Sequence, residues 1–257
     1  MLEWDESRGG DVQRTENAQP YLFAYEYALA QLWISWGVRP AALVGHSVGE
    51  YVAACLARVF TLEEGVRLIS ERGKLMGELP EGGGMAAVFA SENEVRHRLE
   101  EAGITLSIAA VNSPEHTVVS GPLAAIKEAM SHFNDVGAKK LKVSHAFHSE
   151  WMDPALASFE SQLKRIDWRK PELPIFCNLT GEQLVNEMAS PNYWLSHARQ
   201  PVRFSAAVEA VVNSGTRAFL EVGPRGVLMP FVSRILEGKS GYVLPSVRAG
   251  RGELDQM

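Results

Sequence analysis

The feature that most constrains this chain is a serine between two glycines, directly after a short apolar run. The run is Ala41-Ala42-Leu43-Val44 and the motif is Gly45-His46-Ser47-Val48-Gly49. Because the glycines carry no Cβ atom, the backbone can turn sharply from a buried strand into a helix and hold Ser47 at the apex. The first amides of that helix, Val48 among them, would face a developing oxyanion. The motif therefore predicts a catalytic serine. The alternative is a tight structural turn that happens to carry one.

Composition sets wide limits on the rest of the molecule. The chain has 257 residues, of which 46 % are hydrophobic and 22 % charged, as in ordinary globular domains. Its net charge of −6 argues against nucleic acid as the main partner, and no apolar stretch reaches the roughly 20 residues that span a bilayer. The two cysteines, Cys55 and Cys177, lack metal-ligand spacing. We therefore expect no metal and no membrane association, and a cytoplasmic location by default.

Two regions of the sequence show different patterns of secondary structure. In the outer regions we predict helices at 18–36, after Ser47, at 61–79, 154–163, 204–213 and 227–236, and strands at 41–45, 175–179 and 217–221. Between them, the pattern is β-α-β-β-α-β, with strands at 85–90, 106–111, 116–120 and 139–143 and helices at 92–102 and 123–136. That order is the split unit of a ferredoxin-like fold, whose two ends lie close together. We therefore predict an α/β fold: an α/β-hydrolase-like parallel-sheet core, residues 1–83 and 144–257, with a ferredoxin-like subdomain, residues 84–143, inserted in it.

A serine hydroxyl needs a general base within hydrogen-bond distance, and histidine is the usual one. Among the seven histidines, His145 and His148 stand out because they lie where the inserted unit returns to the core. Spacing alone does not choose between them, and an ordinary pair of loop histidines is the alternative. His197, near Trp194, is a weaker candidate whose packing alone would explain it. No aspartate occupies an obvious triad position, and hydrolases of the lipase or esterase type place their histidine late in the chain.

Arg72 is the next unusual residue, because it falls within or beside the apolar stripe of a helix. Thr61 and Glu64 begin that helix as a predicted capping box. A guanidinium keeps its charge when buried, so it needs an acceptor there. One interpretation is a structural salt bridge with an acid such as Glu50 or Glu221. The other is a bidentate contact with the carboxylate of a substrate, which suits the geometry of arginine.

Together these segments resemble the acyltransferase domains of type I modular polyketide synthases, which are related to malonyl-CoA:acyl-carrier-protein transacylases. The matching segments extend over nearly the whole chain and occur in the order that the family has. They are Gln19-Pro20, Arg72-Gly73 and residues 45–50, 110–114, 145–149, 200–204, 221–224 and 244–248. Several spaced motifs in the correct order are far more specific than any one of them.

The resemblance implies that Ser47 is the acylated nucleophile and His148 the general acid/base. The family orients its histidine with a backbone carbonyl, here near Gln200, which would account for the missing aspartate. The implied reaction is ping-pong transfer of a malonyl extender unit from malonyl-CoA to Ser47, and then to the phosphopantetheine thiol of an acyl carrier protein, in polyketide biosynthesis. The resemblance implies no bound cofactor. The implied partners are malonyl-CoA, the carrier protein and neighbouring synthase domains.

The resemblance also implies a substrate pocket. Arg72 would pair with the malonyl carboxylate, Gln19 would line the same pocket, and the amide of Val48 would be one oxyanion donor. The tetrapeptide His145-Ala146-Phe147-His148 resembles the form in malonyl-selective domains, whereas methylmalonyl-selective relatives usually carry Tyr-Ala-Ser-His. Phe147 would fill the space that an α-methyl group needs. Val48 in place of the glutamine common in methylmalonyl-selective domains agrees with this.

One segment of the family pattern has no counterpart. The family begins with a strand and loop bearing Gly-Gln-Gly, whose glutamine amide gives the second oxyanion donor, and no such segment precedes Gln19. Loss of one donor costs on the order of 10²- to 10³-fold in rate. We therefore expect a truncated, less active domain with an exposed sheet edge, followed at residues 248–257 by a linker. The alternatives are a serine thioesterase or hydrolase acting on acyl-CoA, which has no need of an inward Arg72, and a non-catalytic docking module.

Overall fold

The structure is a computed structural model that describes residues 14–143 and 145–247. Helices and strands are interspersed along the whole of this part, as expected for an α/β fold. The helices are α2 (Thr15–Ser35), α3 (Val48–Leu56), α4 (Leu62–Gly77), α5 (Glu92–Glu101), α6 (Leu123–Ser131), α7 (Asp153–Leu163), α8 (Pro191–Arg199), α9 (Phe204–Asn213) and α10 (Met229–Ile235), with a 3₁₀ turn η1 (Glu150–Met152). The strands are β1 (Leu43–Val44), β2 (Gly83–Val88), β3 (Ser107–Ser113), β4 (His116–Pro122), β5 (Ala138–Lys140), β6 (Ile175–Phe176), β7 (Gln183–Leu184), β8 (Ala218–Glu221) and β9 (Tyr242–Pro245). The expected linker at residues 248–257 lies outside the described residues, as do residues 1–13.

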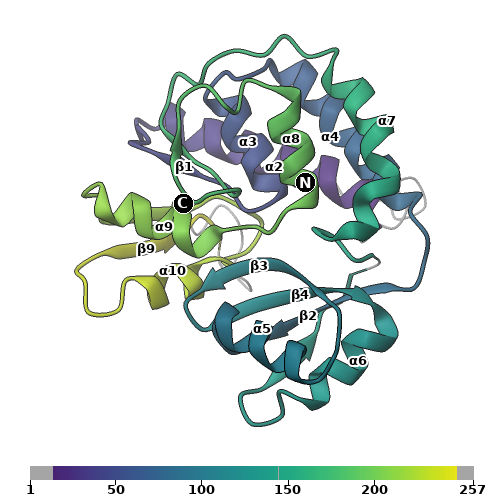
Figure 1. Cartoon of the computed structure of the whole chain (residues 1–257). Coiled ribbons are helices and arrows are strands. Elements are labelled where there is room, and N and C mark those ends of the chain that lie inside the picture. The colour runs from purple at the N-terminus through teal and green to yellow at the C-terminus, as the bar shows by residue number, and fades with distance from the viewer. Residues whose placement is uncertain (1–13, 144, 248–257) are drawn as a thin grey trace.

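The core region has two small sheets with parallel strands. Strand β1 pairs in parallel with β6, which pairs antiparallel with β7, and β8 pairs in parallel with β9. Within the described residues, β1 pairs only with β6 and β8 only with β9, so one edge of each strand has no strand beside it. Helix α9 covers both sheets, because Val44 of β1 and Phe219 of β8 pack against its buried face. The largest apolar cluster lies among α2, α3, α4, α7 and α8 (Figure 1).

The region between residues 83 and 140 forms a separate sheet with the order β3-β4-β2-β5 and all pairs antiparallel. This is the ferredoxin-like order predicted from the β-α-β-β-α-β pattern. Helices α5 and α6 cover one face, where Val95, Ile126 and Phe133 are fully buried. Figure 1 shows this subdomain below the helices of the core, with α9, α10 and β9 beside it. The limits of 84 and 143 that we gave the subdomain stay a prediction.

Two glycines begin the first strand of this subdomain. Gly83 and Gly84 are the first two residues of β2, although a run of glycines often marks a turn or loop. A Cβ atom on Gly83 would come within 2.6 Å of the Ala146 backbone nitrogen. The first strand of the subdomain therefore lies directly against residues 145–148, which carry the two candidate histidines.

Some predicted elements were wrong in extent. The strands expected at 41–45 and 175–179 contain only Leu43–Val44 and Ile175–Phe176, because the chain leaves the sheet early to form the loops of the site. The helix expected to reach residue 136 ends at Ser131, where Phe133 turns into the core. Helix α8 was not predicted, although Ser190 caps its first turn and Pro191 stands at its start.

The capping box predicted at the start of α4 is confirmed. The Thr61 side chain accepts a hydrogen bond from the Glu64 amide, and the Glu64 carboxylate accepts one from the Thr61 amide. Among the helices of the described residues, none is long and apolar enough to cross a bilayer. In the same residues, no cluster of histidine, cysteine and acidic side chains could hold a metal ion.

Candidate active site

Ser47 stands at a sharp turn between β1 and α3. Its backbone has φ 51° and ψ −109°, a conformation that costs a residue with a side chain on the order of 1–3 kcal/mol. A Cβ atom on Gly45 would overlap the Glu50 amide nitrogen, so this position requires glycine. At Gly49 the nearest atom to such a Cβ lies 3.6 Å away, an ordinary contact. The first glycine of the motif is therefore needed for the turn, whereas the second is not.

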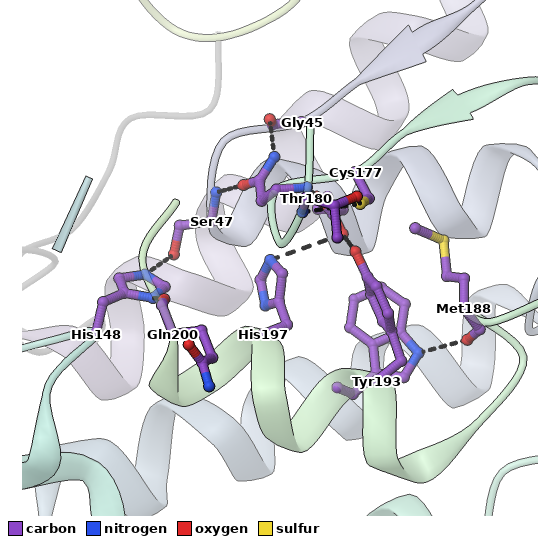
Figure 2. A network of polar contacts seen from close by, with 12 residues as sticks. Gly45, Ser47, His148, Cys177, Thr180, Met188, Tyr193, His197 and Gln200 are labelled. Atoms are coloured by element: carbon purple, nitrogen blue, oxygen red, sulfur yellow. Dashed lines mark hydrogen bonds and ion pairs between the residues drawn. The ribbon is translucent and has the colours of Figure 1, made fainter. Parts of the chain in front are cut away.

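The Ser47 side chain faces His148 (Figure 2). Its Oγ lies 2.9 Å from His148 Nε2, and His148 Nδ1 lies 3.0 Å from the Gln200 carbonyl oxygen. If Nδ1 carries the ring proton and donates a hydrogen bond to that carbonyl, Nε2 has a lone pair that can accept a hydrogen bond from the Ser47 hydroxyl. His145 is placed differently, with its Nε2 3.0 Å from the Leu79 carbonyl oxygen. Of the two histidines between which spacing did not choose, the fold brings His148 to the serine.

His148 is neutral in this environment. It is 5 % exposed, and burial lowers its pKa to about 3, with a further contribution from the positive charge of Arg72. A neutral imidazole can accept a proton from Ser47 at any pH near neutrality. The arrangement is a serine with a base, and the base is oriented by a carbonyl rather than by an acid.

Arg72 is buried, and among the described residues no carboxylate pairs with it. It is 3 % exposed, its Nη1 donates a hydrogen bond to Gln19 Oε1, and its guanidinium lies 5.3 Å from the centre of the Tyr51 ring. Its Nε has no hydrogen-bond partner in the part of the chain that the structure describes, and burial lowers the pKa of the guanidinium. Gln19 is itself held by a bond from its Nε2 to Thr15 Oγ1 of 2.9 Å.

The salt bridge considered for Arg72 is wrong for both acids. The Glu221 carboxylate accepts three amide hydrogen bonds of 2.7–2.9 Å at the start of α10, from Val227, Leu228 and Met229. Glu50 accepts bonds from the Tyr193 hydroxyl and from the Asn178 amide. Within residues 14–143 and 145–247, the ion pairs of the structure involve other basic side chains than Arg72.

A second polar network lies behind the turn and was not predicted. Glu50 is completely buried, and burial raises its pKa to about 8, so it is protonated at neutral pH. His197 Nε2 lies 3.9 Å from the Glu50 carboxyl, and burial lowers the pKa of this histidine. Asn178 links the network to the turn, with its Oδ1 2.8 Å from the Ser47 amide. Its place just after β6, a strand parallel to β1, was the available signal, because such strand ends meet at one edge.

Two further predicted residues lie close to the serine. The Val48 amide, at the start of α3, makes no hydrogen bond to any described residue, whereas the Ser47 amide is bound to Asn178. Phe147 is partly buried between the two largest apolar clusters, and its ring centre lies 5.9 Å from that of His145. Val48 therefore has a free donor at the turn, and Phe147 occupies space between the core and the subdomain.

Comparison with known proteins decides the family. The profile of the family described as the acyl transferase domain matches residues 4–255. The chain belongs to the acyl transferase domain family. The domain is 45 % identical over 249 residues to the polyketide synthase GfsA of Streptomyces halstedii. The aligned segment covers 95 % of this chain and 3 % of GfsA. It therefore spans a small part of that relative. Its enzyme class is that of an acyltransferase, which counts against the hydrolase interpretation.

Solved structures agree with the fold of the acyl transferase domain. The acyltransferase domain from the second module of the salinomycin polyketide synthase superimposes with a TM-score of 0.91 at 39 % identity, over 99 % of this chain and 60 % of that one. A malonyl CoA-acyl carrier protein transacylase from Clostridium perfringens superimposes with a TM-score of 0.86 at 30 % identity, over 93 % and 77 %. The predicted α/β core with an inserted subdomain is thus confirmed as the fold of this family.

Proposed function

We propose that this domain transfers a malonyl group from malonyl-CoA to the phosphopantetheine thiol of an acyl carrier protein, through an ester on Ser47. The observation that carries the proposal is Arg72, a buried guanidinium whose charge acts on His148 and which has no acidic partner among the described residues. A malonyl group is a small acyl group with a free carboxylate, so its binding would supply the missing partner. The similarity to a transacylase for malonyl-CoA supports the same substrate.

The first half of the reaction would acylate the serine. Ser47 Oγ attacks the thioester carbonyl while its proton passes to His148 Nε2, and the Val48 amide donates to the oxyanion. When the carbon–sulfur bond breaks, the imidazolium returns the proton to the departing CoA thiolate. In the second half, the carrier-protein thiol attacks the ester, its proton passes through His148, and Ser47 is regenerated.

Arg72 would affect both the choice of acyl substrate and the basicity of His148. Its charge contributes to the low pKa of His148, and a malonyl carboxylate beside it would offset that charge. The bound substrate would therefore raise the pKa of its own general base. Phe147 would exclude an α-methyl group and so favour malonyl over methylmalonyl units. We propose further that neighbouring domains of a longer cytoplasmic synthase present the carrier protein, and that no cofactor is needed.

Mass spectrometry of the intact chain tests the proposal. After incubation with malonyl-CoA we expect the mass to increase by one malonyl group, located on Ser47, and the Ser47→Ala variant to show none. Addition of a carrier protein bearing phosphopantetheine should remove the group and transfer it to the thiol. Release of free malonate instead would favour the hydrolase alternative, and absence of any adduct would favour a docking module.

A further inference from the structure

Asn178 lies two residues beyond β6, beside the turn that carries Ser47. Strand β6 pairs in parallel with β1, with Phe176 opposite Val44, so both strands end at the same edge of the sheet. Asn178 is 1 % exposed. The proposed function gives it no role. Its position is therefore fixed by the sheet, and its contacts show what it holds.

Both polar atoms of the Asn178 side chain bind the turn itself. Its Oδ1 accepts a hydrogen bond of 2.8 Å from the Ser47 amide, and its Nδ2 donates one of 2.7 Å to the Gly45 carbonyl. One planar amide thus spans the turn and bonds to the residue on each side of His46. Ser47 has a positive φ, so its peptide needs such external contacts to keep its orientation.

The backbone of Asn178 reaches the support of the other catalytic group. Its carbonyl accepts a hydrogen bond of 2.7 Å from the Arg203 amide, three residues after Gln200, whose carbonyl faces His148 Nδ1. Its own amide donates a hydrogen bond of 2.6 Å to Glu50 on α3, the helix that follows Ser47. All four groups of Asn178 are therefore bonded, and they join the serine turn to the segment that orients the histidine.

We propose that Asn178 is a positioning residue that holds the Ser47 turn and the Gln200 carbonyl in register, and so keeps Ser47 Oγ and His148 Nε2 in hydrogen-bond contact. It acts through these two groups and touches no substrate. The inference rests on the roles proposed for Ser47 and His148. It does not depend on which acyl group the domain carries.

The test uses an alkyl fluorophosphonate, which reports on the serine–histidine pair without any malonyl group. Ser47 Oγ attacks the phosphorus, its proton passes to His148, the phosphorus–fluorine bond breaks and fluoride leaves with a proton. We expect Asn178→Ala to slow labelling of Ser47 by about 10- to 100-fold, because a misplaced reacting group is costly. Thr117→Val is the matched control, since it removes a buried hydrogen bond to the Ala90 carbonyl in the subdomain.

Asn178→Asp separates positioning from general stability. A protonated aspartic acid presents one acceptor and one O–H donor, as asparagine does, whereas a carboxylate repels the Gly45 carbonyl. The labelling rate of Asn178→Asp is corrected for the folded fraction at each pH and then divided by the wild-type rate at the same pH. This ratio should rise toward one as the pH falls. The Asn178→Ala ratio should not change with pH. For malonyl-CoA, we expect kcat of Asn178→Ala to fall while KM stays within about threefold.

The outcomes distinguish this inference from the proposed function. Wild-type labelling by the fluorophosphonate without a malonyl adduct would refute malonyl transfer and leave the role of Asn178 standing. Wild-type rates for folded Asn178→Ala would overturn the positioning role. So would an Asn178→Asp ratio that stays flat with pH, and this variant decides the question if Asn178→Ala does not fold.

Discussion

Glu50 and Arg72 are both buried near the Ser47–His148 pair, and both have ionisable side chains, but they differ in their partners and in their charge. Glu50 finds its partners inside the protein, the Tyr193 hydroxyl and the Asn178 amide, and its raised pKa makes it neutral. Arg72 keeps its charge and, within residues 14–143 and 145–247, contacts an amide oxygen and an aromatic face but no acid. A buried group whose partners all come from the chain stabilises the fold. One whose partner is missing is suited to bind a ligand.

The largest effect should come from Arg72. We expect Arg72→Ala to lower kcat/KM for Ser47 acylation by malonyl-CoA by roughly 10²- to 10³-fold, because the substrate carboxylate loses its buried partner. Acylation by acetyl-CoA, which has no carboxylate, should be unchanged or faster. The unfolding temperature should fall only modestly, since the variant breaks no ion pair and loses one hydrogen bond to Gln19 and the contact with the Tyr51 ring. Arg98→Ala, which removes a surface ion pair with Asp135, is the control. Equal losses with both acyl-CoA substrates would contradict the comparison.

The next effect concerns Glu50 and is one of stability. Glu50→Ala leaves the Tyr193 hydroxyl and the Asn178 amide without an acceptor and should lower the free energy of unfolding by about 2–4 kcal/mol. Glu50→Gln imitates the protonated acid. Its amide oxygen accepts from the Asn178 amide, and its NH2 group donates to the Tyr193 hydroxyl oxygen in place of the bond that Tyr193 donates to Glu50, so the free energy of unfolding should stay within about 1 kcal/mol of the wild-type value. Denaturant unfolding at neutral pH measures both. Similar losses in the two variants would show that Glu50 is ionised.

The pH dependence of stability should separate His148 from Glu50. His148 has a folded pKa of about 3 against 6.5 in the unfolded chain, so the unfolded state takes up a proton first and stability is lost as pH falls below about 6.5. Glu50 has a folded pKa of about 8 against 4.5, so its contribution is complete below about pH 4.5 and is lost as pH rises from there through 8. Between about pH 4.5 and 6.5 the two slopes therefore oppose each other. Each group gives a slope of up to about 1.4 kcal/mol per pH unit. His148→Asn should reduce the slope below about pH 4.5, and Glu50→Gln should reduce the slope between about pH 6.5 and 8; unchanged slopes would contradict these assignments.

The smallest effect should concern the acyl group itself. Replacing Phe147 by serine and His145 by tyrosine should reduce discrimination against methylmalonyl-CoA by about tenfold, because exclusion of one methyl group is worth only about 1–3 kcal/mol. Competition between the two acyl-CoA substrates, followed by mass spectrometry of the Ser47 ester, measures it. An unchanged preference for malonyl-CoA over methylmalonyl-CoA would show that Phe147 does not line the acyl pocket. Acylation by malonyl-CoA alone should be retained, which serves as the internal control.

Much of the fold was predictable because its signals are local. The capping box at Thr61, the helix at residues 204–213 and the order of the inserted subdomain each depend on a few neighbouring residues. The strands β1 and β6 were overestimated because their length depends on where the chain leaves the sheet. Helix α8 was missed because its buried residues, Trp194 and His197 among them, did not stand out as one apolar stripe.

For the site, the sequence by itself determined the serine turn, two candidate histidines and an arginine in an apolar helix face. The family resemblance named His148, and the structure brings that histidine rather than His145 to the serine. Only the tertiary structure decided that neither acid pairs with Arg72 and that Asn178 joins the turn to the support of the histidine. The reason is physical. A turn or a cap is made by adjacent residues, whereas these contacts join groups 52 to 131 positions apart, and only the packed sheet and helices bring such groups together.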